Sequence, residues 1–153
     1  MKKTIAKLLL LSIAILLVGC AALNDTVSGN PWRTYPGSPL PPDQVALIKT
    51  SGLRNFSGEA YITRINDRVV EKFGGYIESL PGSYVLAVRV THRIGGPGSL
   101  LSALTEKQGR GIITLEAEAG HVYIVDGEVA DGQAAILWIE DEKTHEVVAG
   151  KKP

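Results

Sequence analysis

Two segments of the chain alternate apolar and polar side chains with a period of two residues, in residues 84–93 and again in residues 112–119. Successive side chains of a strand point to opposite faces of its sheet, so each segment predicts a strand with one dry face and one wet face. The residues expected to face inward are Leu86, Val88, Val90, Ile113, Leu115, Ala117 and Ala119, and those expected to face outward are Arg89, Thr91, Arg93, Thr114, Glu116 and Glu118.

The rest of residues 44–150 also predicts short strands separated by turns. Val122–Val125 and Ala134–Ile139 are apolar on both faces, which is typical of central or covered strands. Seven to nine short strands predict one all-β domain, an antiparallel β-sandwich over residues 44–150. Further strands are expected at Val45–Lys49, Glu59–Asn66, Arg68–Val70, Tyr76–Leu80 and Glu146–Ala149, and turns at Asn66-Asp67, Pro81-Gly82, Asp126-Gly127, Asp131-Gly132 and Glu142–Thr144.

Residues 99–106 leave two structures open. With Ser99 as N-cap they can form about two turns of helix, and behind the glycine-rich stretch Gly95–Gly98 they can equally form an extended loop. The glycine-rich stretch lacks the Lys-Ser/Thr pair that completes a phosphate-binding loop, so it predicts a turn and not a nucleotide site.

The N-terminus predicts an export signal. Lys2, Lys3 and Lys7 precede an apolar run, Leu8–Val18, which is shorter than the roughly 20 residues that span a bilayer. The run ends at Leu17-Val18-Gly19-Cys20, which resembles the lipobox of bacterial lipoproteins. This resemblance implies cleavage between Gly19 and Cys20 and attachment of acyl chains at Cys20, which anchor the chain to a membrane. An ordinary secretory signal with a chance cysteine, or an uncleaved anchor, are the alternatives.

The charge of the chain and the residue after Cys20 limit which partners and which membrane are expected. The 16 basic and 16 acidic residues balance, so the chain lacks the basic excess expected of a nucleic-acid-binding protein. Removing residues 1–19 takes away three lysines and no acids, which makes the remaining 134 residues mildly acidic. Position 21 is Ala and not the Asp that retains many Gram-negative lipoproteins in the inner membrane, so the resemblance implies the periplasmic face of the outer membrane.

A proline-rich stretch follows the lipobox. Five of the eight prolines lie between Pro31 and Pro42, and such density favours extended polyproline II. Residues 20–43 are therefore expected to be a semi-rigid tether. Trp32 and Tyr35 suggest a second arrangement, in which this stretch folds back and covers an edge of the domain, and a partner-docking motif is a third.

Several short segments resemble a recurring pattern in small bacterial outer-membrane lipoproteins. The pattern includes Tyr35-Pro36-Gly37, Leu80–Tyr84, Glu116–Tyr123 and Trp138–Asp141. The Leu-Pro-Gly segment that leads into an alternating strand is also similar to PEGA-like and prealbumin-like β-sandwich modules. The resemblance implies a fold and an envelope location, and it implies no catalytic residues.

The histidines do not predict a metal site. His92, His121 and His145 are the only three and lie on separate segments, without a second ligand at metal-binding spacing. His92 is expected to be half-buried near a strand end, and His121 to fix a turn through a backbone hydrogen bond.

The carboxylates and the nucleophilic residues do not predict an active site either. Glu116 and Glu118 should point the same way from one strand, roughly 7 Å apart, which is within the range of inverting glycosidase pairs but on the wet face. Glu140–Glu142 is expected to be a solvated hairpin, with weak calcium binding as the alternative. The single cysteine is taken by the lipid, and no Gly-x-Ser-x-Gly motif is present.

These features predict a lipid-anchored accessory protein that binds an unknown envelope protein, and not an enzyme. No catalytic residue, cofactor or metal is predicted. The alternative is a periplasmic binder of a small ligand or glycan, in which Tyr61, Tyr76 or Tyr123 would supply stacking surfaces, while Trp138 is expected in the core.

Overall fold

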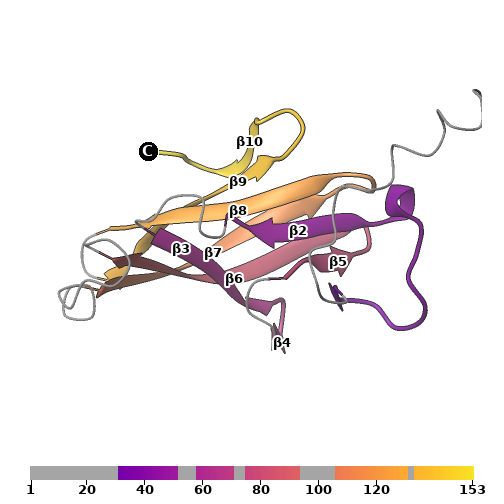
Figure 1. Cartoon of the computed structure of the whole chain (residues 1–153), viewed down its shortest axis with the longest axis horizontal. Helices are drawn as coiled ribbons and strands as arrows, with labels where there is room; N and C mark the ends of the chain where they lie inside the picture. Colours follow the sequence, from indigo (N-terminus) through magenta and orange to yellow (C-terminus); the bar gives the residue numbers. More distant parts are fainter. Residues whose placement is uncertain (1–30, 52–57, 71–74, 94–105, 131–132) are drawn as a thin grey trace, which may run out of the picture.

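The computed structural model describes residues 31–51, 58–70, 75–93, 106–130 and 133–153 (Figure 1). The predicted leader, Gly19, Cys20, residues 99–105 and the turn at Asp131-Gly132 lie outside these ranges. Apart from one short 3-10 turn, Pro42–Gln44, the regular structure in the described ranges is strand. The strands are β1 Trp32–Arg33, β2 Ala46–Thr50, β3 Gly58–Ile65, β4 Arg68–Val69, β5 Ile77–Ser79, β6 Gly82–Arg93, β7 Glu106–Ala117, β8 Val122–Val129, β9 Ala135–Asp141 and β10 Val147–Gly150.

The strands form two sheets that pack face to face, and the predicted all-β sandwich is confirmed (Figure 1). One sheet has six strands in the order β1-β5-β2-β8-β9-β10, and the other has four in the order β4-β3-β6-β7. The apolar core lies between them. Its most fully buried large side chains are Ile48, Ile65, Leu86, Leu115 and Ile139, which come from both sheets.

The two alternating segments lie in strands, as predicted: residues 84–93 belong to β6, and residues 112–117 form the second half of β7. Leu86, Val88, Val90 and Leu115 are all buried in the core. Two residues differ from the expectation. Thr91, predicted on the wet face, is 6% exposed, because its short side chain lies between Glu59 and Gln108 of the flanking strands. Ala119, predicted to face inward from a strand, lies beyond the end of β7 in a turn.

The predicted turn at Asp126-Gly127 is wrong. Both residues lie inside β8, where Asp126 pairs with Trp138 and Gly127 with Leu137. A Cβ atom at position 127 would stand 2.7 Å from Leu137 Cδ2 and 2.9 Å from Val90 Cγ2. The glycine is therefore needed for close packing between the two sheets, and it does not mark a chain reversal.

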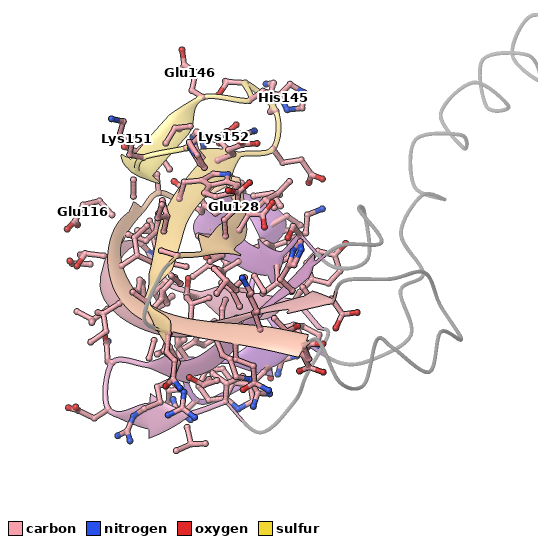
Figure 2. The ribbon with its side chains drawn as sticks, turned by 90° about the vertical axis from the view of Figure 1, so that its left-hand side faces the viewer. Glu116, Glu128, His145, Glu146, Lys151 and Lys152 are labelled. Atoms are coloured by element: carbon pink, nitrogen blue, oxygen red, sulfur yellow. The ribbon has the colours of Figure 1, made fainter. Side chains whose placement is uncertain are left out.

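The predicted C-terminal hairpin is present. Residues 142–144 form the turn after β9, and β10 pairs antiparallel with β9. Figure 2 shows His145 and Glu146 at the outer end of this hairpin. Val122–Val125 and Leu137–Ile139 have buried residues on both faces, as expected for covered strands.

The six-stranded sheet is mixed, whereas the prediction had antiparallel strands. β2 pairs parallel with β8, and β1 pairs parallel with β5. The remaining strand pairs are antiparallel.

The start of the proline-rich stretch is packed on the domain, which is the second arrangement expected for it. Trp32 and Arg33 extend the sheet beside β5, and Trp32 packs against the core. Glu78 on β5 is only 7% exposed; it accepts a hydrogen bond from the Tyr35 hydroxyl and lies 3.4 Å from Arg33 Nε. A buried carboxylate held by a cation and a hydroxyl fixes this segment in place.

Arg68 on β4 holds the same segment from the other sheet. Its guanidinium lies 4.7 Å from the centre of the Trp32 ring and donates a hydrogen bond of 2.8 Å to the carbonyl of Thr34. Residues 32–34 are therefore bound to both layers of the sandwich.

Candidate functional site

Two arginines stand side by side on the outer surface of the four-stranded sheet. The register pairs Tyr61 on β3 with Arg89 on β6, and Arg89 in turn with Arg110 on β7. The Arg89 guanidinium lies 5.4 Å from the centre of the Tyr61 ring. We call the surface made by Tyr61, Thr63, Arg64, Ala87, Arg89, Arg110 and Ile112 the arginine face.

The position of Arg110 follows from the packing of β7 against β9. A Cβ atom at position 109 would stand 2.5 Å from the carbonyl oxygen of Ala134, and one at position 111 would stand 2.8 Å from Leu137 Cδ1. Glycine at both positions lets the two strands come close. Arg110, between them, is exposed on the opposite side of β7.

The arginine face contains a shallow cavity of about 600 Å³. Arg89 and Arg110 supply its charge, and Ile112, with 73% of its surface exposed, supplies an apolar rim. Val85, on the same face of β6, is 44% exposed. The face therefore offers positive charge and apolar surface together, which suits recognition of an acidic group attached to an apolar one.

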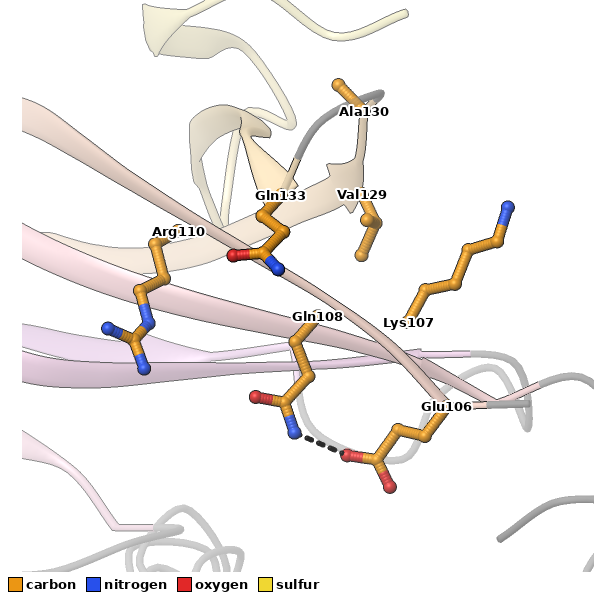
Figure 3. Close-up of a pocket in the computed structure, with 7 residues that line it drawn as sticks. All are labelled: Glu106, Lys107, Gln108, Arg110, Val129, Ala130 and Gln133. Atoms are coloured by element: carbon orange, nitrogen blue, oxygen red, sulfur yellow. Dashed lines mark hydrogen bonds between the residues drawn. The ribbon is translucent and has the colours of Figure 1, made fainter. Parts of the chain in front are cut away.

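Arg110 also lines a second cavity of about 610 Å³, between the start of β7 and the end of the β8–β9 hairpin. Figure 3 shows Gln108, Arg110 and Gln133 around it, with Val129 and Ala130 on the β8 side. Gln108 Nε2 donates a hydrogen bond of 3.0 Å to a Glu106 carboxylate oxygen. Gln133 has a φ of 69°, a backbone conformation that non-glycine residues adopt at a cost and that is frequent at functional sites.

A third cluster ties the start of β8 to the C-terminal hairpin. His121 Nδ1 donates to Asp141 Oδ2 over 2.7 Å, and Asp141 Oδ1 accepts the backbone N–H groups of Lys143 and Thr144, each at 2.9 Å. These hydrogen bonds, the one from His121 foremost, lower the pKa of Asp141 from 3.8 to about 2. The imidazole ring is stacked on Tyr123, and burial raises the pKa of the Tyr123 hydroxyl.

Both ring nitrogens of His121 face carboxylates. A histidine held by a carboxylate can act as a general base if a nucleophile lies against its second nitrogen. Here the Glu118 carboxylate lies 3.7 Å from His121 Nε2. His121 was expected to fix the turn at Ala119-Gly120 through a backbone hydrogen bond. Its carbonyl accepts a hydrogen bond of 3.0 Å from the N–H of Leu47 on β2, while its side chain binds Asp141 and not the turn.

The predicted carboxylate pair does not converge. Glu116 accepts a hydrogen bond of 2.6 Å from Ser83, while Glu118 lies beyond the end of β7 and faces His121. The segment Glu140–Glu142 is not a solvated trio as expected, because Asp141 is 4% exposed and its two neighbours are paired. Glu140 binds Lys152 and Glu142 binds Lys49, each over 2.5 Å.

The three histidines occupy different parts of the sandwich. His92 is half-buried on β6, as predicted, opposite Gly58 and Lys107. His145 lies in the C-terminal turn with a φ of 60°. Over the ranges that the structure describes, no group of three or more His, Cys, Asp or Glu side chains is arranged to hold a metal ion.

The aromatic residues proposed for glycan stacking do not form one platform. Tyr123 is 3% exposed and belongs to the core, Tyr61 lies under Arg89, and Lys49 lies 5.4 Å from the Tyr76 ring. Trp138 is buried, as predicted, with the Lys152 ammonium 5.8 Å from its ring centre.

Sequence reasoning placed Arg89 on the outer surface and missed Arg110, Gln108 and Gln133. The polar spacing in β6 indicates where Arg89 points, but only the register with β7 sets Arg110 opposite it.

In the described residues, no helix combines the length and the apolar character needed to cross a bilayer. No family model, curated protein or solved structure matches the chain.

Proposed function

We propose that this protein is a lipid-anchored accessory protein of the bacterial envelope, held at the periplasmic face of the outer membrane, that works by binding another envelope protein and not by catalysis. The observation that carries the proposal is the apolar run ending at Leu17-Val18-Gly19-Cys20. Two or more acyl chains attached near Cys20 are enough for stable membrane binding.

The fold supports a domain that stays near the membrane. Because Trp32 is already part of the six-stranded sheet, only residues 21–31 separate the sandwich from Cys20. Eleven extended residues reach at most about 35–40 Å. The arginine face would therefore be presented within that distance of the lipid surface, plus the size of the domain itself.

The binding half of the proposal is supported by the exposed apolar side chains of the four-stranded sheet. Val69, Val85 and Ile112 are 60%, 44% and 73% exposed. Apolar side chains beside arginine are typical of the centres of protein interfaces. The family assignment as a PEGA-like envelope lipoprotein is part of the same proposal and rests on the short segments named above.

Photo-crosslinking in living cells tests this binding. A photoreactive amino acid at Ile112 or Val85 is expected to give a discrete crosslinked product, and one at Lys143, exposed in the C-terminal turn, is expected to give none. The measurement is an immunoblot of the irradiated envelope fraction. An identical pattern at all three positions, or no product at any, would contradict an interaction through this sheet.

A second candidate function is binding of a small polar ligand or saccharide in the cavity of Figure 3. Its volume of about 610 Å³ and its amide and guanidinium groups favour this candidate. In a thermal-shift screen of envelope saccharides, a true ligand should raise the melting temperature of the wild-type chain and not that of Gln133→Gly. Equal shifts in both chains would remove this candidate.

A further inference from the structure

We propose that the arginine face binds an acidic, partly apolar polypeptide segment of the partner protein, with a carboxylate between Arg89 and Arg110 and an apolar side chain against Ile112. This inference rests on the proposed function, because it names the chemistry of the partner that the accessory protein would bind.

The charge arrangement points to an anionic partner. Arg89 and Arg110 are directly opposite in an antiparallel pair, where Cβ atoms lie about 4.5–5.5 Å apart and like charges destabilise the sheet. Within the part of the chain that the structure describes, the Arg110 guanidinium forms no hydrogen bond or ion pair. A carboxylate between two guanidinium groups is attracted to both and can accept two parallel hydrogen bonds from either fork.

The charge is local to this face. Arg64 lies in the next row of the same sheet, opposite Ala87, and its Nη2 donates a hydrogen bond to the Asp67 carbonyl. Three acids lie on the outer surface of the four-stranded sheet away from the arginine pair. Glu59 is one row from the pair, Glu106 is two rows from it and accepts a hydrogen bond from Gln108, and Glu116 is bound to Ser83. After removal of residues 1–19 the chain is mildly acidic overall, and a positive cluster on such a chain is complementary to an acidic partner surface.

The apolar residues favour a polypeptide over a phosphate group or a sugar acid. Ile112 is 73% exposed and stands opposite Ala87, in the row next to the arginine pair. Val85 continues the apolar surface along β6. A phosphate or a free carboxylate would contact only the guanidinium groups, whereas a peptide with acidic and apolar side chains would use both.

A defined peptide tests this with the full chain purified in detergent. The probe is a fluorescein-labelled nonapeptide that repeats Asp-Glu-Leu three times, with versions in which Ser replaces Leu or Lys replaces both acids. Fluorescence anisotropy should show saturable binding of the Asp-Glu-Leu peptide and none of the Lys version. Arg110→Glu should weaken the binding about tenfold or more, as expected for a charge reversal at a contact.

Two further variants separate the charge from the apolar contact. Ile112→Ser should lower the affinity for the Asp-Glu-Leu peptide several-fold and leave the affinity for the Ser version unchanged. Lys143→Glu, the same charge reversal in the remote C-terminal turn, should change affinity less than about twofold, since it is a long-range effect screened by salt. Arg110→Gln serves in place of Arg110→Glu if the latter unfolds, as judged by circular dichroism.

Other outcomes would overturn the inference. Absence of binding, or equal binding to wild type and Arg110→Glu, excludes the acidic contact. Displacement of the peptide by millimolar inorganic phosphate, together with no effect of Ile112→Ser, would identify the occupant as a phosphate group and not a polypeptide. If the peptide does not bind but the crosslinked product at Ile112 still forms, the partner binds this face through a segment that is not acidic. If both fail, the proposed function fails as well.

Discussion

Replacing Cys20 with alanine is expected to remove the protein from the outer-membrane fraction and to leave a larger precursor that keeps residues 1–19. The thiol of Cys20 is the only one in the chain, so no other residue can take the lipid. Loss of the acyl chains removes about 0.8 kcal/mol of membrane binding for each buried CH₂ group, which amounts to the whole anchor. Density-gradient fractionation and immunoblotting measure both effects.

A matched variant separates lipid attachment from sorting. Ala21→Asp keeps Cys20 and should be processed normally, but the protein should move to the inner-membrane fraction, because aspartate at this position retains the lipoproteins that the lipobox resembles. If Cys20→Ala has the size and the fractionation of the wild type, lipid anchoring is excluded.

Replacing Asp141 with asparagine is expected to lower the free energy of unfolding at pH 7 by about 2 kcal/mol, the equivalent of the pKa shift that the fold imposes on this carboxyl. Asparagine retains an oxygen for the N–H groups of Lys143 and Thr144. It loses the negative charge that accepts the hydrogen bond from His121 Nδ1. Urea denaturation measures the difference.

The pH dependence of this difference has a definite sign. Because the pKa of Asp141 is lower in the folded chain than in the unfolded chain, its contribution is fully present above pH 3.8 and is lost as the pH falls through about 2. The difference between wild type and Asp141→Asn should therefore shrink between about pH 4 and pH 2. A difference that stays constant or grows on acidification would show that the charge of Asp141 is not responsible.

Glu146→Gln is the control for this substitution. Glu146 lies at the outer end of the same hairpin (Figure 2) and is exposed, so the substitution removes a carboxylate charge from this hairpin without removing a buried side chain. Its unfolding free energy should stay within about 0.5 kcal/mol of the wild type, as surface substitutions usually do.

Local patterns predicted those elements whose conformation depends on local residues. The alternation in residues 84–93 and 112–117 predicted β6 and the second half of β7, and the buried faces followed from it. The first half of β7, from Glu106, was not predicted as strand. The turn predicted at Asp126-Gly127 was wrong because Asp-Gly favours a turn when only the local sequence is considered. The requirement for glycine there comes from Leu137 and Val90, which approach from elsewhere in the sequence.

Long-range contacts determined what the sequence did not predict. Trp32 and Tyr35 suggested that the proline-rich stretch folds back onto the domain, but not where it lies. The position of β1 beside β5 depends on Glu78, whose burial between Tyr35 and Arg33 is not visible in the sequence. The arginine face has the same origin, because Arg89 and Arg110 are brought together only by the register of β6 with β7. The predicted lipobox, in contrast, is a contiguous pattern, so it was proposed from the sequence alone and does not depend on the fold.

Mass spectrometry of the N-terminal tryptic peptide tests the central claim, that Cys20 is the lipid-bearing N-terminus of the mature protein. Trypsin should release residues 20–33 from the protein purified from its native membrane, since Arg33 is the first basic residue after Cys20. The account predicts a diacylglyceryl group on the Cys20 sulfur and an acyl group on its amine. A peptide with an unmodified Cys20 thiol, or one that begins before Cys20, would contradict it.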